Sequence, residues 1–140
     1  MQARLGGSVR KIGLMVALVV LSGACSDSAD DTPAVAPEEK RAPAAEVTAG
    51  LRRIEAIVAD VAAQAGTDKT KATELSEGIE EEWEPVEGTV KANDQDTYIS
   101  FEDDFATLEG AAKAGDAAKA KTAADRIAAT VRSYTERYPG

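Results

Sequence analysis

Acidic side chains are concentrated around one stretch of this 140-residue sequence, which runs from Trp83 to Glu109. Carboxylate oxygens are the ligands that hard cations such as calcium, manganese and ferric iron prefer. At 100° per residue, Glu84 and Glu87 fall on one flank of an expected helix, and Glu102 flanks the core of the next. We therefore predict that a metal cation binds between these flanks. The predicted metal ligands are Glu84, Glu87 and Glu102, with Trp83, Tyr98 and Asp94 as accessory residues.

The same residues have a simpler interpretation. Charged runs on helices usually mark a solvated face, which would bind nothing. Trp83, Tyr98, Phe101 and Phe105 could form a platform for a ligand, but aromatic residues at helical spacing are more typical of a core. Both alternatives stay open on the sequence alone.

Several classes of site are excluded. The sequence contains no histidine, which removes serine–histidine and cysteine–histidine hydrolases and histidine-ligated zinc sites. Asp94 and Asp96 are spaced like the opening of a calcium loop, but Ile99 stands where that loop needs glycine and Phe105 where it needs glutamate. Paired carboxylates can hydrolyse glycosides, but a small helical bundle hardly provides the cleft. We expect no enzyme.

Residues 1–24 have the layout of an export signal, with basic residues, an apolar run from Ile12 to Leu21, and small residues before Cys25. The apolar run is about ten residues long, whereas a membrane span needs roughly 20. The motif LSGAC resembles the lipobox of bacterial lipoproteins. That resemblance implies cleavage before Cys25 and diacylation of its thiol, which is a stable membrane anchor. The alternative is a plain secretory signal with an unrelated cysteine.

The charge of the chain limits its partners. The formal net charge is −9, and removal of residues 1–24 takes away three of 16 basic residues and none of 25 acidic ones, which leaves 13 − 25 = −12. Such a chain repels nucleic acid and anionic lipid headgroups, and it favours cationic partners or metal ions. We expect an extracytoplasmic, lipid-anchored protein with no nucleic-acid partner. Residues 25–45 are small and polar, and we predict a flexible tether there.

The remaining sequence, residues 46–140, has apolar residues at alternating spacings of three and four, which is typical of amphipathic helices. Pro85 interrupts the second helix, and we expect a kink there rather than a new helix, because the apolar stripe continues to Val90. The predicted fold is all-α, an antiparallel up-down-up-down four-helix bundle. A bundle formed across a dimer is the alternative. The expected helices are approximately 46–65, 68–91, 94–113 and 116–138.

Three local expectations follow from the same pattern. Asn93 is expected to cap the third helix. Tyr98 and Phe105 are expected to be buried on that helix. Tyr134 and Tyr138 are expected at an edge, with their hydroxyl groups in water.

The central residues also resemble a known family. The pattern Trp83, Val86, Glu87, Gly88, Lys91, followed after a turn by Asp94 or Asp96, Tyr98, Phe101 and Glu102, resembles imelysin-like iron-uptake lipoproteins and the periplasmic helical segment of high-affinity iron permeases. The resemblance covers about twenty residues, and it implies a helical scaffold and metal handling. The histidine-containing metal motif of the imelysin-like proteins has no counterpart here, so its site is not carried over.

The sequence therefore predicts a membrane-anchored helical bundle that binds a metal cation, or assists a metal permease in iron uptake, through its acidic hairpin. The alternative is a structural or protein-interaction module of the cell envelope with no small-molecule ligand.

Overall fold

The structure is a computed structural model, and it describes residues 41–140. The predicted signal peptide at 1–24, the predicted lipidation site Cys25 and the predicted tether up to residue 40 lie outside the described residues.

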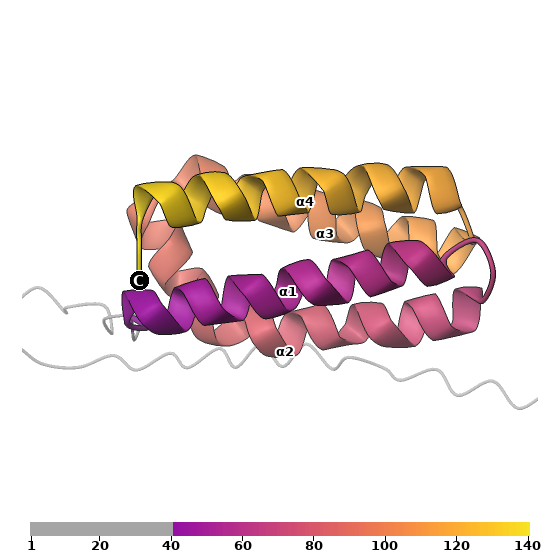
Figure 1. Ribbon diagram of the computed structural model, residues 1–140, viewed down its shortest axis with the longest axis horizontal. Helices are drawn as coiled ribbons and strands as arrows, with labels where there is room; N and C mark the ends of the chain where they lie inside the picture. The colour runs from indigo at the N-terminus through magenta and orange to yellow at the C-terminus, as the bar shows by residue number, and fades with distance from the viewer. Residues whose placement is uncertain (1–40) are drawn as a thin grey trace, which may run out of the picture. The chain divides into compact units, whose positions relative to one another are not determined.

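The described chain folds into four α-helices and contains no strand. Short links join consecutive helices, which pack side by side as a four-helix bundle (Figure 1). The all-α bundle is as predicted, and each helix begins and ends within two residues of its predicted bound. No described helix is long and apolar enough to cross a membrane. The helices are α1 (Ala44–Gln64), α2 (Lys69–Asn93), α3 (Gln95–Ala114) and α4 (Ala117–Arg137).

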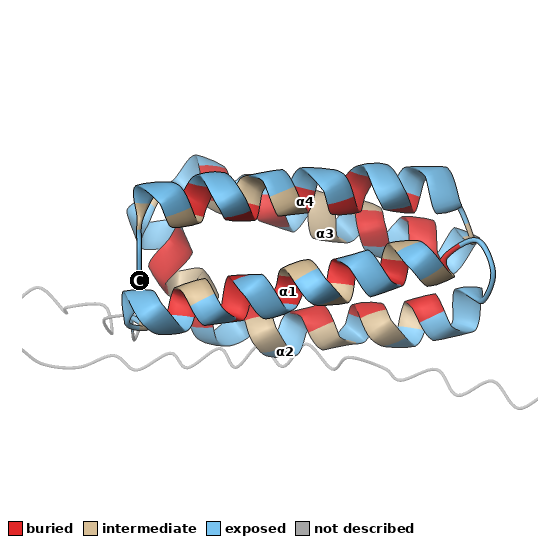
Figure 2. Cartoon of the chain, in the orientation of Figure 1, coloured by how far each residue is buried: buried red, intermediate tan, exposed pale blue. Residues whose placement is uncertain are grey.

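The core lies where the apolar stripes of the four helices meet, and the outward faces are exposed (Figure 2). Every buried side-chain nitrogen or oxygen within residues 41–140 has a hydrogen-bond partner. The buried polar side chains of the bundle are thus satisfied from within the protein. The largest fully buried side chains are Trp83, Tyr134, Phe101, Leu51, Ile54, Leu108 and Ile127.

Aspartate caps begin three of the four helices. The carboxylates of Asp68, Asp94 and Asp116 each accept a hydrogen bond at 3.0 Å from the backbone N–H three residues later. Asp94, and not the predicted Asn93, therefore caps α3, because Asn93 is still the last residue of α2. Gly115 ends α3 at φ 73°, a left-handed conformation that glycine adopts without a steric cost.

Helix α2 continues through Pro85 as one helix, so no new helix starts there. Its last turns rise toward α4 (Figure 1). Opposite this region, Gly50 of α1 lets the two helices approach closely: a Cβ atom at Gly50 would lie 3.1 Å from Val86 Cγ1 and 3.4 Å from the Glu82 carbonyl oxygen.

Three further expectations are corrected. The predicted tether ends too late: α1 already begins at Ala44, and the amide of Ala42 donates to Thr89 Oγ1 at 2.7 Å. Tyr98 and Phe105 are only partly buried, although both pack against the core. Tyr134 is not an edge residue: it is 1% exposed, and its hydroxyl group accepts a hydrogen bond from Asn93 Nδ2 at 2.9 Å.

Candidate functional site

The predicted metal site is not assembled. Within residues 41–140 no group of three or more acidic or cysteine side chains is placed to hold a metal ion. Glu84 is exposed and faces Arg41, Pro43 and the start of α1. Glu87 is half-buried, and Glu102 is engaged by an aromatic residue of α2 instead.

That aromatic residue is Trp83. Its indole N–H donates to Glu102 Oε1 at 2.6 Å, which ties α2 to α3. The ring centroid of Trp83 lies 5.2 Å from that of Phe101, 5.3 Å from that of Phe105 and 5.9 Å from that of Tyr98. Trp83 is 1% exposed. The aromatic residues therefore form a seam between two helices, as the core interpretation of the sequence predicted, and Glu102 fixes the indole rather than a cation.

A groove of about 410 Å³ runs beside this seam, between α2 and α3. Two apolar side chains and a half-buried ring contribute to its lining, and carboxylates stand on both helices around them. The groove thus combines an apolar floor with an acidic rim that both helices supply. We call it the acidic groove. Its lining residues are Ile79, Phe105 and Ala106, with Ser76, and the rim residues Glu77, Glu80, Glu102 and Glu109.

The two sides of the rim differ in how far they are neutralised. On α3, Glu109 pairs with Lys113 one turn away, whereas Glu102 accepts from the neutral indole of Trp83 and keeps its charge. On α2, neither Glu77 nor Glu80 makes a hydrogen bond or ion pair with any other described residue. Like charges three residues apart on a helix repel by about 0.2–0.5 kcal/mol. Both rim glutamates of α2 are therefore uncompensated, and on α3 only Glu109 is compensated by a basic residue.

One exposed apolar side chain lies in line with the groove. Ile99 is the only large hydrophobic residue among the described ones that is classed as exposed, at 46%. It precedes Glu102, Ala106 and Glu109 on α3 at spacings of three, four and three, which places all four on one side of the helix within about 80°. Ile99 thus extends the α3 wall of the acidic groove with an apolar contact.

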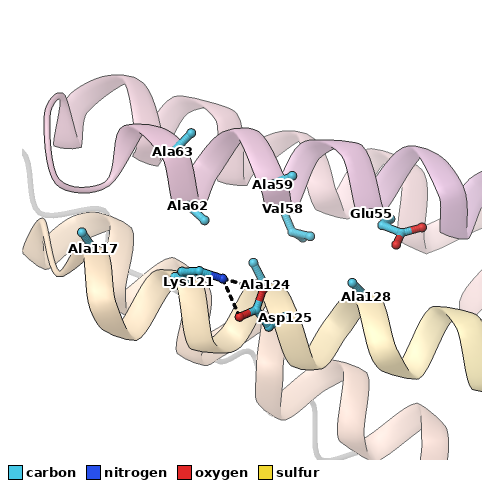
Figure 3. Close-up of a pocket in the computed structure, with 10 residues that line it drawn as sticks. All are labelled: Glu55, Val58, Ala59, Ala62, Ala63, Ala117, Lys121, Ala124, Asp125 and Ala128. Carbon is cyan, nitrogen blue, oxygen red and sulfur yellow. Dashed lines mark hydrogen bonds and ion pairs between the residues drawn. The ribbon is translucent and has the colours of Figure 1, made fainter.

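A second groove, of about 490 Å³, lies between α1 and α4. Alanine side chains from the two helices face each other across it (Figure 3). Its charged residues are mutually compensated: Lys121 pairs with Asp125 at 2.7 Å, and Glu55 pairs with Arg132 at 3.7 Å. We call it the alanine groove. It is lined by Val58, Ala59, Ala62, Ala63, Ala117, Ala124 and Ala128, with Glu55, Lys121 and Asp125.

The predicted accessory residue Asp94 has a structural role. Besides capping α3, its carboxylate forms an ion pair with Arg137 of α4, whose guanidinium also donates to Thr97 Oγ1 at 3.0 Å. The Thr97 backbone N–H first, then the Thr97 hydroxyl and Arg137, hold the pKa of Asp94 below its ordinary value of 3.8. A carboxylate with a lowered pKa stabilises the fold at pH values above about 4 and loses that contribution as the pH falls through the lowered pKa.

The rim residues Glu77, Glu80 and Glu109 were not predicted as site residues. Glu80 belongs to the acidic run that the sequence shows, but Glu77 lies before that run. The place of Glu109 on the rim depends on how α2 and α3 are rotated relative to each other, which the sequence does not specify. The available signal was the spacing of Ile99, Glu102, Ala106 and Glu109 along one side of α3. No protein family, curated protein or solved structure was found to match this chain.

Proposed function

We propose that this chain is a lipid-anchored, non-enzymatic interaction module of the cell envelope, which binds a partner protein in the acidic groove. The observation that carries the proposal is the groove itself, where Glu77 and Glu80 stand uncompensated beside exposed Ala106 and the half-buried ring of Phe105. Unpaired carboxylates next to exposed apolar surface leave both kinds of surface available to a partner.

Metal binding is not part of this proposal. Hard cations in all-protein sites take several oxygen ligands at once, and no such group is assembled in the part of the chain described. A partner protein requires no convergence of carboxylates on one point. It uses the length of the groove, on which the four rim glutamates are spread along two helices.

The membrane part of the proposal comes from the lipobox-like LSGAC sequence, which ends at Cys25. A lipid on Cys25 would hold the bundle at the membrane surface, so the partner would be another envelope protein. Replacement of Cys25 by serine is expected to abolish incorporation of radiolabelled palmitate and to release the chain from the membrane fraction. Unchanged labelling and fractionation would contradict the anchor.

Site-specific photo-crosslinking in cells that naturally make the protein tests the groove. A photoreactive amino acid at Ala106, on the groove floor, is expected to give a discrete adduct with another envelope protein. The matched position is Ala118, which is exposed on α4 and lines neither groove. Adduct formation from Ala106 should fall at least fivefold in the Glu77→Gln/Glu80→Gln variant. No adduct from Ala106, or equal adducts from both positions, would overturn the proposal.

A further inference from the structure

The acidic groove presents its apolar and charged groups in an order that specifies one kind of partner. The accessible apolar groups run from exposed Ile99 to exposed Ala106 on α3, beside the half-buried ring of Phe105, whereas Ile79 of α2 is only 5% exposed. Carboxylates stand on both sides of this apolar line, Glu77 and Glu80 on one helix and Glu102 and Glu109 on the other. A ligand that pairs with both the apolar groups and the carboxylates must be apolar along its middle and cationic along both edges.

The length of this surface sets the size of the ligand. From Ile99 to Glu109, α3 rises by about 15 Å at 1.5 Å per residue, which corresponds to roughly three turns of a bound helix. An amphipathic helix of that length presents apolar residues at spacings of three and four, with flanking residues about a right angle away on each side. An extended chain, in contrast, alternates its side chains between two faces and places only every second one on the groove.

Resting on the proposed function, we propose that the acidic groove binds a cationic amphipathic helix of the partner, about three turns long. Its apolar stripe packs on Ile99, Ala106 and the half-buried ring of Phe105, and its lysine or arginine residues lie along both rims. This is the helix-in-groove mode of recognition, with the charge pattern fixing the orientation. Four of the five basic residues of α4 are in ion pairs already, so they are not available to the acidic groove.

The experiment uses the full chain in nanodiscs of uncharged phosphatidylcholine, with empty nanodiscs as the blank. The probe is a synthetic 14-residue helical peptide with leucines in one stripe and lysines along both edges. Its comparator has the same composition, with the leucines dispersed around the helix, and spermine serves as a cation without apolar groups. The amphipathic peptide is expected to bind at least tenfold more tightly than the dispersed one, and spermine weaker still. Equal affinity for the two peptides would overturn the inference.

Two double substitutions distinguish binding in the acidic groove from general electrostatic attraction to an acidic protein. Glu77→Gln/Glu80→Gln removes two rim charges and is expected to weaken binding of the amphipathic peptide at least tenfold. Glu81→Gln/Glu84→Gln removes the same charge from exposed positions of α2 outside the acidic groove, and should change the affinity less than threefold. Equal losses in the two variants would show non-specific electrostatic binding and overturn the inference.

Ile99→Ser tests the apolar line without disturbing the core, because Ile99 is exposed. It should weaken binding of the amphipathic peptide three- to tenfold and leave spermine unaffected. An unchanged affinity would exclude Ile99 from the surface proposed. If the peptides show no preference while Ala106 still gives its specific adduct in cells, only the cationic-helix inference fails. Loss of the adduct as well would remove the proposed function.

Discussion

The acidic groove and the alanine groove have similar volumes, about 410 and 490 Å³, but opposite surface chemistry. Helix α2 carries seven acidic and three basic residues, and α3 carries five and one, whereas α4 carries five basic and only two acidic ones. The basic residues of α4 therefore neutralise the α1–α4 side of the bundle. Both grooves are a consequence of helix packing. The unpaired charges around each groove decide what can bind there.

The two seams are also built from residues of different size. Aromatic rings fill the contact between α2 and α3, while alanine and valine line the groove between α1 and α4. Interhelical distance follows the side chains at the contact. The aromatic seam should thus carry more of the stability, and the alanine seam should have room for larger side chains.

The largest effect is expected from Trp83→Ala. Removal of this buried side chain should lower the free energy of unfolding by about 3–5 kcal/mol, because the ring contacts to α3 and the bond to Glu102 are lost together. Urea unfolding followed by far-ultraviolet circular dichroism measures it. Trp83→Phe keeps one ring but removes the bond and part of the indole, so its loss should be clearly smaller. A loss below about 1 kcal/mol for the alanine variant would show that the aromatic seam does not hold α2 and α3 together.

A smaller effect of opposite sign is expected in the other seam. Ala128→Leu extends an apolar side chain into the alanine groove and should raise stability by about 0.5–2 kcal/mol. Ala118→Leu places the same side chain on an exposed position away from both grooves, where changes stay within about 0.5 kcal/mol. Thermal unfolding of the two variants gives the comparison. A destabilised Ala128→Leu protein would mean that the alanine groove is already closely packed.

The smallest expected changes in stability compare an uncompensated charge, Glu80, with a compensated one, Lys121. Glu80→Lys replaces repulsion with attraction to Glu77 and Glu84 and should stabilise the fold by about 0.3 kcal/mol, whereas Lys121→Gln breaks the pair with Asp125 and should destabilise it by a similar amount. Both differences should vanish near 1 M salt, where screening acts within about 3 Å. If both variants shift stability in the same direction at low salt, the assignment of compensated and uncompensated faces is wrong.

Much of the fold could be predicted because each helix carries a nearly complete apolar stripe. The stripe cannot specify hydrogen bonds between distant residues. Tyr134 has the spacing of any apolar residue, and the amide that satisfies its hydroxyl group is 41 positions away. The partial exposure of Phe105 likewise depends on how far α2 covers it, which the sequence of α3 does not contain.

The predicted metal ligands and the acidic groove share Glu102 but differ on α2 by two helical turns. The sequence placed Glu84 and Glu87 opposite Glu102, whereas the structure places Glu77 and Glu80 on the α2 rim of the groove. Residues seven apart share a face on a straight helix. The neighbour of α2 changes along its length, however. Glu80 lies beside α3, whereas Glu84 lies beside the start of α1. The spacing of residues along a helix predicts which of them share a face, but it does not predict which helix packs beside that face.

The missing side chain at Gly50 has a consequence for the opposite side of α2. Its bare backbone lets Val86, three residues after Trp83, and the carbonyl of Glu82, one residue before it, lie close to α1. A methyl group there would come closer to Val86 than ordinary van der Waals contact allows, so Val86 would have to move by a few tenths of an ångström. A residue outside the acidic groove thus sets how closely α1 approaches the helix that carries Glu77 and Glu80.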